Sequence, residues 1–216
     1  MTKFSLIIPA GGTSSRYGNK NKLLELIDNK TVIEHSLENF LLFDEITEVI
    51  IPTNVSIREE IEHLLTDKRI KFVEGGNTRQ KSVFNALKHV QNEYVIIHDG
   101  ARPLIKEGVI SQVMDSVVEF GAVSVMTKTT DTIKEVNEDG LIVKTIDRSK
   151  LYNTQTPQAF KTSLIRDAHY KFLDMEFTDD SAMLEELNIP VYVVLGSYTN
   201  IKITTKSDLD FAKLYI

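Results

Sequence analysis

Five short, continuous apolar runs constrain the fold of this chain more than any other feature of the sequence. They are rich in β-branched residues and lie at 4–8, 48–52, 94–98, 122–126 and 191–195. Such runs are typical of strands buried on both faces, as in a mostly parallel sheet. Between them lie segments whose apolar residues have helical spacing, at 33–43, 82–90 and 108–120. The alternation predicts an α/β domain, a Rossmann-like three-layer sandwich around a mostly parallel sheet.

Residues 129–148 break this alternation. The segment "TTDTIKEVNEDGLIVKTIDR" contains two extended runs joined by "NEDG", which is a strong β-hairpin signal. A polar hairpin that projects from a sheet has little stability alone, so we expect it to pack on another surface, such as a second subunit. The sheet resumes near 191, and a last helix is expected at about 207–215 with Ser207 or Asp208 as its N-cap.

Length and charge narrow the function classes. The 216 residues fit one domain, 1–216, and the net charge of −6 provides no overall basic field for nucleic acid or an anionic membrane. The chain has no cysteine, which excludes disulfides, thiolate metal sites and cysteine nucleophiles. No apolar stretch approaches the ~20 residues of a membrane helix, and the N-terminal run is too short for a signal peptide. We therefore expect a cytoplasmic protein.

The loop after the first strand has the composition of an anion site. In open α/β sheets ligands bind beyond the carboxyl ends of the strands, where "PAGGTSSRYGNKNK" lies. This loop matches neither the dinucleotide fingerprint, nor the Walker A motif, nor the hydrolase nucleophile elbow. What remains is a run of small residues followed by Arg16, Lys20 and Lys22, which could neutralise a triphosphate. A solvated basic turn explains the loop equally well.

Three further segments carry polar residues beside apolar runs. In "HDGARP", Asp99 could hold Mg²⁺ together with phosphate oxygens or cap a helix, and Arg102 could bind a phosphate or pair with an acid. In "EGGNTRQKS" the glycines permit backbone contact with a nucleobase, although a tight turn is the simpler interpretation. Lys202 lies on a strand that looks buried and needs an anionic partner, from the protein or from a substrate.

Residues 145–160, "TIDRSKLYNTQTPQAF", carry the charged pair Asp147-Arg148 and then an expected long polar loop that contains Thr156-Pro157-Gln158. The simplest interpretation of Asp147 and Arg148 is an internal salt bridge. Taken together, these segments provide two or three cations, one carboxylate for a metal and glycine loops for a base. That combination is the outline of a nucleotidyl-transfer site.

Seven motifs in collinear order make the outline specific. From Ser5 to Leu214 the chain carries "PAGG…R.G…K", "EGG..R..SV", "HDGARP", "DTIK", "TIDR..L…QTPQ.F", "TDD.A..E" and "NIKITT..DL". With these motifs it resembles the nucleotidyltransferases that activate sugar phosphates, specifically the 2-C-methyl-D-erythritol 4-phosphate cytidylyltransferase family of non-mevalonate isoprenoid synthesis. The resemblance implies a fold of the nucleotide-diphospho-sugar transferase type, transfer of CMP from CTP to the polyol phosphate with release of pyrophosphate, and a Mg²⁺ cofactor.

The resemblance also implies roles for individual residues. Arg16 and Lys22 would bind the CTP phosphates and stabilise the transition state, and Lys202 would reach the α-phosphate and the incoming phosphate. Asp99 would contact CTP, the metal and the substrate. The cytidine would be held by Ala10, Gly11, Gly12, Gly76 and Ser82. The polyol phosphate would be positioned by Arg102 and Thr156.

The projecting hairpin arm, at about 129–150, would form a homodimer in such a protein. Thr132 and Arg148 would then bind substrate in the active site of the neighbouring subunit, with Arg148 also catalytic. Two departures from the family pattern bear on these roles. The first loop reads Gly-Gly-Thr-Ser-Ser, with serine in place of a later glycine, and Asn21 in place of proline before Lys22 makes Lys20 a rival for the catalytic lysine.

Other functions remain open from the sequence. A ribitol 5-phosphate cytidylyltransferase of teichoic acid synthesis shares the "AGG" opening and "QTPQ", whereas "HDGARP" and Asp147-Arg148 favour the erythritol enzyme. A sugar-phosphate nucleotidyltransferase that uses UTP or GTP is a second alternative. A regulatory domain that only binds nucleotide is the third, because a fold does not fix a function.

Overall fold

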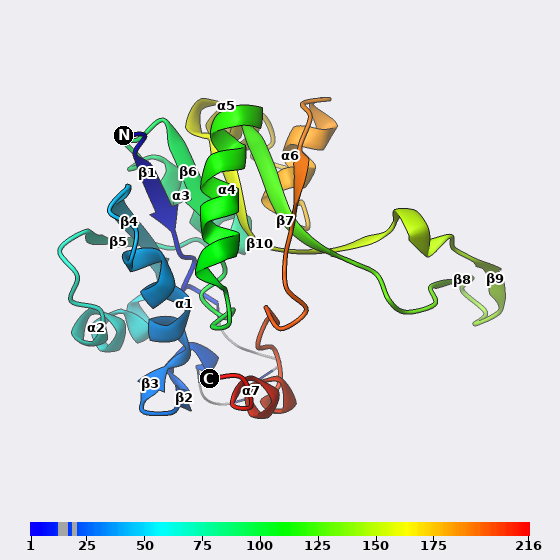
Figure 1. Ribbon diagram of the computed structural model, residues 1–216, viewed down its shortest axis with the longest axis horizontal. Helices are drawn as coiled ribbons and strands as arrows, with labels where there is room; N and C mark the ends of the chain where they lie inside the picture. The colour runs from blue at the N-terminus through cyan, green and yellow to red at the C-terminus, as the bar shows by residue number, and fades with distance from the viewer. Residues whose placement is uncertain (13–16, 19–20) are drawn as a thin grey trace.

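The computed structural model describes residues 1–12, 17–18 and 21–216, and it is built around one seven-stranded sheet (Figure 1). The strands, in chain order, are β1 (Phe4–Ile7), β4 (Ile46–Thr53), β5 (Ile70–Glu74), β6 (Tyr94–Ile97), β7 (Ala122–Lys128), β10 (Tyr152–Lys161) and β11 (Tyr192–Leu195). Their order across the sheet is β11-β7-β10-β6-β1-β4-β5, and every pairing is parallel except those of β10. The mostly parallel α/β architecture is therefore confirmed.

Helices cover both faces of the sheet. One face carries α1 (Val32–Leu41), α2 (Val55–Leu64), α4 (Glu107–Phe120) and α7 (Lys206–Ala212), and the other carries α3 (Arg79–Leu87), α5 (Thr162–Lys171) and α6 (Asp180–Glu186). Successive strand residues point to opposite faces, so Leu6 and Ile8 pack in the first core and Ile7 packs in the second. These two buried cores make the three layers.

Strand β10 corrects the prediction of a long polar loop after Arg148 and through Thr156-Pro157-Gln158. It runs antiparallel between β6 and β7, and residues 155–160 are buried. Its ladder to β7 is interrupted between Thr154 and Gln158, where Pro157 has no N–H to donate. Polar side chains and a proline disfavour a central strand, but here Gln158 donates to the Ser124 hydroxyl at 2.9 Å. Partners distant in the sequence thus satisfy the buried polar groups.

The last helix begins earlier than predicted. Its N-cap is Thr205 and not Ser207 or Asp208, because Thr205 and Asp208 form a capping box. The Thr205 hydroxyl accepts from the Asp208 N–H at 3.4 Å, and the Asp208 carboxylate accepts from the Thr205 N–H at 2.7 Å. The T-x-x-D spacing was the signal for this start, and the helix ends at Ala212.

The predicted hairpin is confirmed as an arm that projects from the body of the molecule (Figure 1). Strands β8 (Lys134–Val136) and β9 (Ile142–Thr145) pair antiparallel around a turn closed by Gly140, whose φ is +82°. The arm residues 130–145 are mostly exposed. The salt bridge interpreted for Asp147 and Arg148 is wrong. The Asp147 carboxylate instead accepts from the Ser149 N–H at 3.0 Å, and Arg148 donates to the Thr130 carbonyl.

Shorter elements complete the chain. They are the 3₁₀ turns η1 (Lys22–Leu24) and η2 (Arg148–Lys150) and the small pair β2 (Leu26–Ile27) and β3 (Lys30–Thr31). Lys202 lies in an irregular segment and not on the strand that the sequence predicted. Among the helices that the structure describes, none is long and apolar enough to cross a membrane. The cytoplasmic location stays a prediction.

Candidate active site

A cavity of about 340 Å³ lies beyond the carboxyl ends of β1 and β6. The chain passes from β1 to β4 and β5 on one side and then returns to β6 on the other side of β1. Such a reversal of strand order opens a crevice at the sheet edge. The cavity is lined by the loop after β1, the turn before α3, the loop after β6 and the segment before α7.

One wall of the cavity is made by small residues. Gly11, Gly12, Gly76 and Ser82 all line it. That they hold the cytidine stays a prediction. The Ser82 hydroxyl accepts from the Gly76 N–H and donates to the Thr78 carbonyl, both at 2.9 Å, and so locks the turn before α3. A Cβ at Gly76 would lie 2.5 Å from a side-chain carbon of α3, which explains the glycine. Ala10 is fully buried behind this wall.

Asp99 lies at the centre of the polar side of the cavity and is only 7 % exposed. Its Oδ1 pairs with Nε of Arg79 at 2.8 Å, and its Oδ2 pairs with Nζ of Lys202 at 2.8 Å and Nε of Arg102 at 3.7 Å. Burial alone would raise the pKa of Asp99, but the three cations outweigh burial and hold this pKa well below its usual range. The anionic partner expected for Lys202 is thus a protein carboxylate.

Thr156 and His98 hold the backbone of Asp99 through a chain of hydrogen bonds. The Asp99 N–H donates to the Thr156 hydroxyl at 3.0 Å, and this hydroxyl lies 3.1 Å from Nδ1 of His98. Because Nε2 of His98 faces the Arg102 carbonyl at 3.1 Å, Nε2 carries the proton and Thr156 donates to Nδ1. Burial lowers the pKa of His98 to about 4, so the ring is neutral near pH 7.

Two residues predicted to hold the polyol phosphate lie outside the cavity lining. Thr156 is buried beneath Asp99, and the guanidinium of Arg102 donates to the Asn200 carbonyl at 2.7 Å while facing Asp99. The acid-pairing interpretation of Arg102 is therefore confirmed. Direct contact of either side chain with a phosphate stays a prediction.

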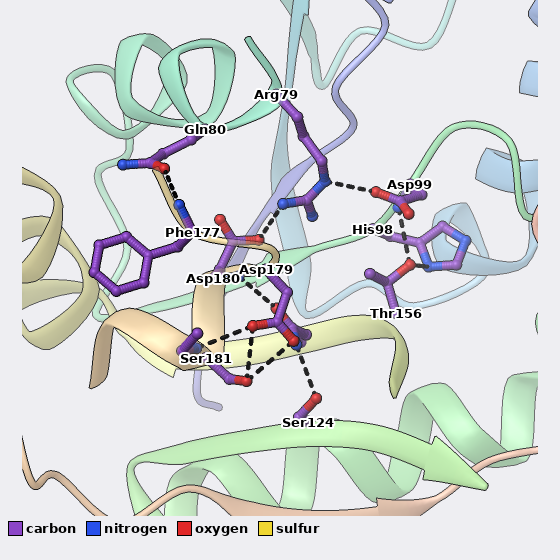
Figure 2. A network of polar contacts seen from close by, with 12 residues as sticks. Arg79, Gln80, His98, Asp99, Ser124, Thr156, Phe177, Asp179, Asp180 and Ser181 are labelled. Atoms are coloured by element: carbon purple, nitrogen blue, oxygen red, sulfur yellow. Dashed lines mark hydrogen bonds and ion pairs between the residues drawn. The ribbon is translucent and has the colours of Figure 1, made fainter. Parts of the chain in front are cut away.

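Sequence reasoning missed Arg79 and Asp180. Arg79 begins α3, and its Nη1 lies 2.8 Å from Oδ2 of the buried Asp180 while its Nε holds Asp99 (Figure 2). Burial would lower the pKa of Arg79, but Asp180 and Asp99 raise it above the usual value for arginine. Both residues lie in quoted motifs, "EGG..R..SV" and "TDD.A..E", which were the available signal.

Of the predicted basic residues and the residues of the arm, some line the cavity and others do not. Lys22 lines the cavity, and its Nζ donates to the Ile203 carbonyl at 2.7 Å. Arg16 and Lys20 lie outside the described residues. Thr132 and Arg148 lie on or at the base of the projecting arm and are not among the residues that line the cavity of their own chain.

The described residues that line the cavity offer few carboxylates for binding a metal ion. Within the described ranges, no cluster of three or more His, Asp or Glu side chains could hold a metal ion. Asp99 is the one carboxylate among the described lining residues, and both of its oxygens pair with cations. This donor set suits an ion that is coordinated mainly by substrate phosphates, as Mg²⁺ commonly is.

Comparison with known proteins identifies the family. The family model described as 2-C-methyl-D-erythritol 4-phosphate cytidylyltransferase (IspD) matches residues 4–216. The chain belongs to this family. A member from Syntrophus aciditrophicus (strain SB) is 41 % identical over 224 residues, which cover 99 % of this chain and 96 % of that protein. A member from Bacillus cereus (strain ATCC 14579) is 40 % identical over 221 residues, covering 99 % and 97 %.

Solved structures of 2-C-methyl-D-erythritol 4-phosphate cytidylyltransferases have the same fold. The 4-diphosphocytidyl-2C-methyl-D-erythritol synthase of Anaerococcus prevotii DSM 20548 superposes with a TM-score of 0.89 at 33 % identity, covering 99 % of this chain and 96 % of that one. The cytidylyltransferase of Thermus thermophilus gives 0.84 at 28 % identity, covering 99 % and 98 %. The nucleotidyltransferase fold expected from the resemblance is confirmed.

Membership of the cytidylyltransferase family establishes the reaction. The enzyme transfers CMP from CTP to 2-C-methyl-D-erythritol 4-phosphate in the non-mevalonate pathway to isoprenoids. The regulatory binding module considered above is wrong, because the family consists of enzymes. The family model and these relatives give no support to the ribitol 5-phosphate alternative.

Proposed function

We propose that CMP transfer takes place in the cavity at the carboxyl ends of β1 and β6, with Mg²⁺ on the nucleotide and with a contribution from the arm of a second subunit. One observation carries the proposal. The same cavity combines a glycine wall for a flat base with two lysines, Lys22 and Lys202, for phosphates.

The chemistry requires little beyond positioning and charge. A phosphate oxygen of the polyol attacks the α-phosphorus of CTP, the bond to the β-phosphate breaks, and pyrophosphate leaves with the electron pair. The attacking oxygen is already anionic, so no general base is needed. Catalysis then depends on alignment of the two phosphates and on cations placed where negative charge accumulates.

Lys202 is suited to stabilise that charge. Its Nζ is fixed 2.8 Å from Asp99, while the side chain remains 36 % exposed toward the cavity. A fixed cation does not have to reorganise during the reaction, which makes its electrostatic contribution larger. Lys22 and, by resemblance, Arg16 would act on the other phosphates of CTP.

The turn before α3 is suited to bind the cytosine. The Ser82 hydroxyl fixes both the N–H of Gly76 and the carbonyl of Thr78, so the turn is rigid before the nucleotide binds. The lack of a side chain at Gly76 lets the turn pack directly against Lys81 of α3, where a Cβ would lie 2.5 Å away, and so fixes the backbone that lines the cavity. We propose that this rigid turn selects the smaller pyrimidine ring.

The Mg²⁺ in this proposal is held mostly by the triphosphate. Asp99 would be its protein ligand, and the ion would supply charge neutralisation on the phosphates when bound. Removal of divalent cations with EDTA should abolish pyrophosphate release, and added Mg²⁺ should restore it. Full activity in excess EDTA would contradict this part of the proposal.

The arm is suited to cover a second subunit. The arm is a two-stranded ribbon, and such a ribbon has only marginal stability alone. It exposes five apolar side chains, those of Ile133, Val136, Leu141, Ile142 and Val143. Apolar residues grouped in this way mark protein interfaces. In a homodimer with exchanged arms, Thr132 and Arg148 would reach the cavity of the neighbour.

Complementation tests the exchange of arms. We expect Arg148→Ala and Lys22→Ala each to be nearly inactive as pure dimers. If Arg148 acts in the neighbour, a mixed dimer has one site with both defects and one intact site. Equal mixing with full exchange of subunits would then restore about one quarter of the native activity. No recovery after exchange is verified would show that Arg148 acts within its own chain or not at all.

The location of the reaction is tested with Lys202→Ala. Pyrophosphate release should be measured with CTP and methylerythritol phosphate, with ribitol 5-phosphate as the control substrate. Lys206→Ala is the matched control, because Lys206 is exposed at the start of α7 and does not line the cavity. A loss in kcat of ~10²-fold in Lys202→Ala, without such a loss in Lys206→Ala, supports the site. Equal activity of the two variants would contradict it.

A further inference from the structure

The backbone of Asp180 is fixed by strand β10. Its N–H donates to Oε1 of Gln158 at 3.1 Å, and the amide of Gln158 donates to the carboxylate of Asp179 at 3.0 Å. Asp179 in turn caps α6 by accepting from the Ala182 N–H at 3.0 Å. Asp180 itself is 1 % exposed. Its carboxylate therefore occupies a defined place in the interior, outside the cavity lining.

The carboxylate of Asp180 holds one edge of a guanidinium that reaches the cavity. Oδ2 of Asp180 lies 2.8 Å from Nη1 of Arg79, and Nε of Arg79 lies 2.8 Å from Oδ1 of Asp99 (Figure 2). The guanidinium is a rigid planar fork, so fixing Nη1 also fixes the direction of Nε. His169 lies on the far side of Asp180, with Nε2 3.6 Å from Oδ1.

We propose that Asp180 is a positioning residue for CMP transfer, which acts through Arg79 on Asp99. Arg79 occupies Oδ1 of Asp99 and leaves Oδ2 to face Lys202. With Asp180 present, the two carboxylates and the three cations Arg79, Arg102 and Lys202 carry one net positive charge. Without it they carry two, and Nη1 of Arg79 loses the partner that sets the direction of Nε toward Oδ1 of Asp99. The inference rests on the role proposed above for Lys202.

The first test is Asp180→Asn, which keeps the shape and removes the charge. We expect kcat to fall by ~10- to 10²-fold, because a misplacement of about 1 Å at a reacting centre can cost that much. The KM for CTP should change by less than about threefold, since the glycine wall is untouched. Asp67→Asn is the matched control. It removes the partner of Arg69, at 2.9 Å, in a pair outside the cavity lining, and it should leave kcat unchanged.

The second test places the same change in an Arg79→Gln background. If Asp180 acts through Arg79, Asp180→Asn causes no further loss of kcat there. The Tm should respond with opposite signs. Asp180→Asn lowers the Tm of the native chain, but it raises the Tm of Arg79→Gln, because it removes a buried charge that has lost its main partner.

Several outcomes would overturn the proposal. These are an unchanged kcat in Asp180→Asn, a multiplicative loss of kcat in the double variant, or a lower Tm in both backgrounds. The reversal in Tm is measured without substrate. It therefore reports the ion pair alone, and Lys202→Ala separates the two failures. An unchanged kcat in Asp180→Asn with a large loss in Lys202→Ala overturns only the role of Asp180, whereas an unchanged kcat in both variants overturns the proposed site.

Discussion

The pH dependence of stability should contain a component that belongs to His98. The ring is buried, with Nε2 donating to the Arg102 carbonyl and Nδ1 accepting from Thr156. Protonation would place a second N–H against the Thr156 hydroxyl, and it would add positive charge beside Arg102 and Arg79. Burial accordingly lowers the pKa of His98 to about 4 from the usual 6.5.

The sign and size of the effect follow from linkage. Between about pH 6.5 and pH 4 the unfolded chain binds a proton at His98 and the folded chain does not, so stability falls as the pH falls. This histidine should remove about 2 kcal/mol from the free energy of unfolding between pH 7 and pH 5, and about 3 kcal/mol by pH 4. Asp99 and Asp180, whose pKa values are lowered, lose their contributions only below about pH 4.

Urea unfolding of the native chain and of His98→Gln at several pH values measures this component. The variant should be less stable at pH 7, because it loses the packing of the ring against Phe40, whose centroid is 4.9 Å away. The gap between the two proteins should narrow by about 2 kcal/mol from pH 7 to pH 5 and stay constant from pH 7 to pH 8.5. A gap of constant size over the whole range would refute the reasoning.

Three substitutions around the cavity give further expectations. Lys22→Ala should lower kcat by ~10²–10³-fold in a pyrophosphate-release assay, and the same loss in Lys20→Ala instead would mean that the catalytic lysine was misassigned. Gly76→Ala should raise the KM for CTP, because the new Cβ would lie 2.5 Å from a side-chain carbon of α3, whereas Gly108→Ala meets nothing within 4 Å and should not. Asp99→Asn should lower the free energy of unfolding in urea by about 3 kcal/mol, since it leaves buried cations without their shared anion. An unchanged unfolding curve would mean that this ion-pair network adds no stability.

The sequence predicted those parts of the fold whose signals are local. The apolar runs at β1, β4, β6, β7 and β11 indicated strands because each run is itself apolar. The burial expected for the last run is wrong, because β11 lies at the edge of the sheet and only Val194 of its four residues is buried. Strand β10 escaped prediction because its polar residues are satisfied by partners far away, such as Ser124 for Gln158 and His98 for Thr156. Local propensity cannot represent such partners.

The same distinction holds for the site. Gly76, Asp99 and Lys202 could be predicted to meet because each ends an element at one edge of the sheet or needs a partner of opposite charge. The pair of Arg79 and Asp180 could not, because Asp179-Asp180 alone indicates only the start of a helix. Arg79 likewise indicates only the first turn of one.

The arm leaves the body and returns to it at a single point. Lys128 at the end of β7 faces Tyr152 at the start of β10, and the Thr129 N–H donates to the Leu151 carbonyl at 3.0 Å. Adjacent antiparallel strands with ends this close can be joined by a turn of about two residues. In evolutionary and engineering terms the arm is therefore an insertion between two adjacent antiparallel strands. The arm could be lengthened, exchanged or excised without a change in the order of the strands in the sheet. If the arm makes the subunit contact proposed above, the number of subunits could change while the architecture of the body stays the same.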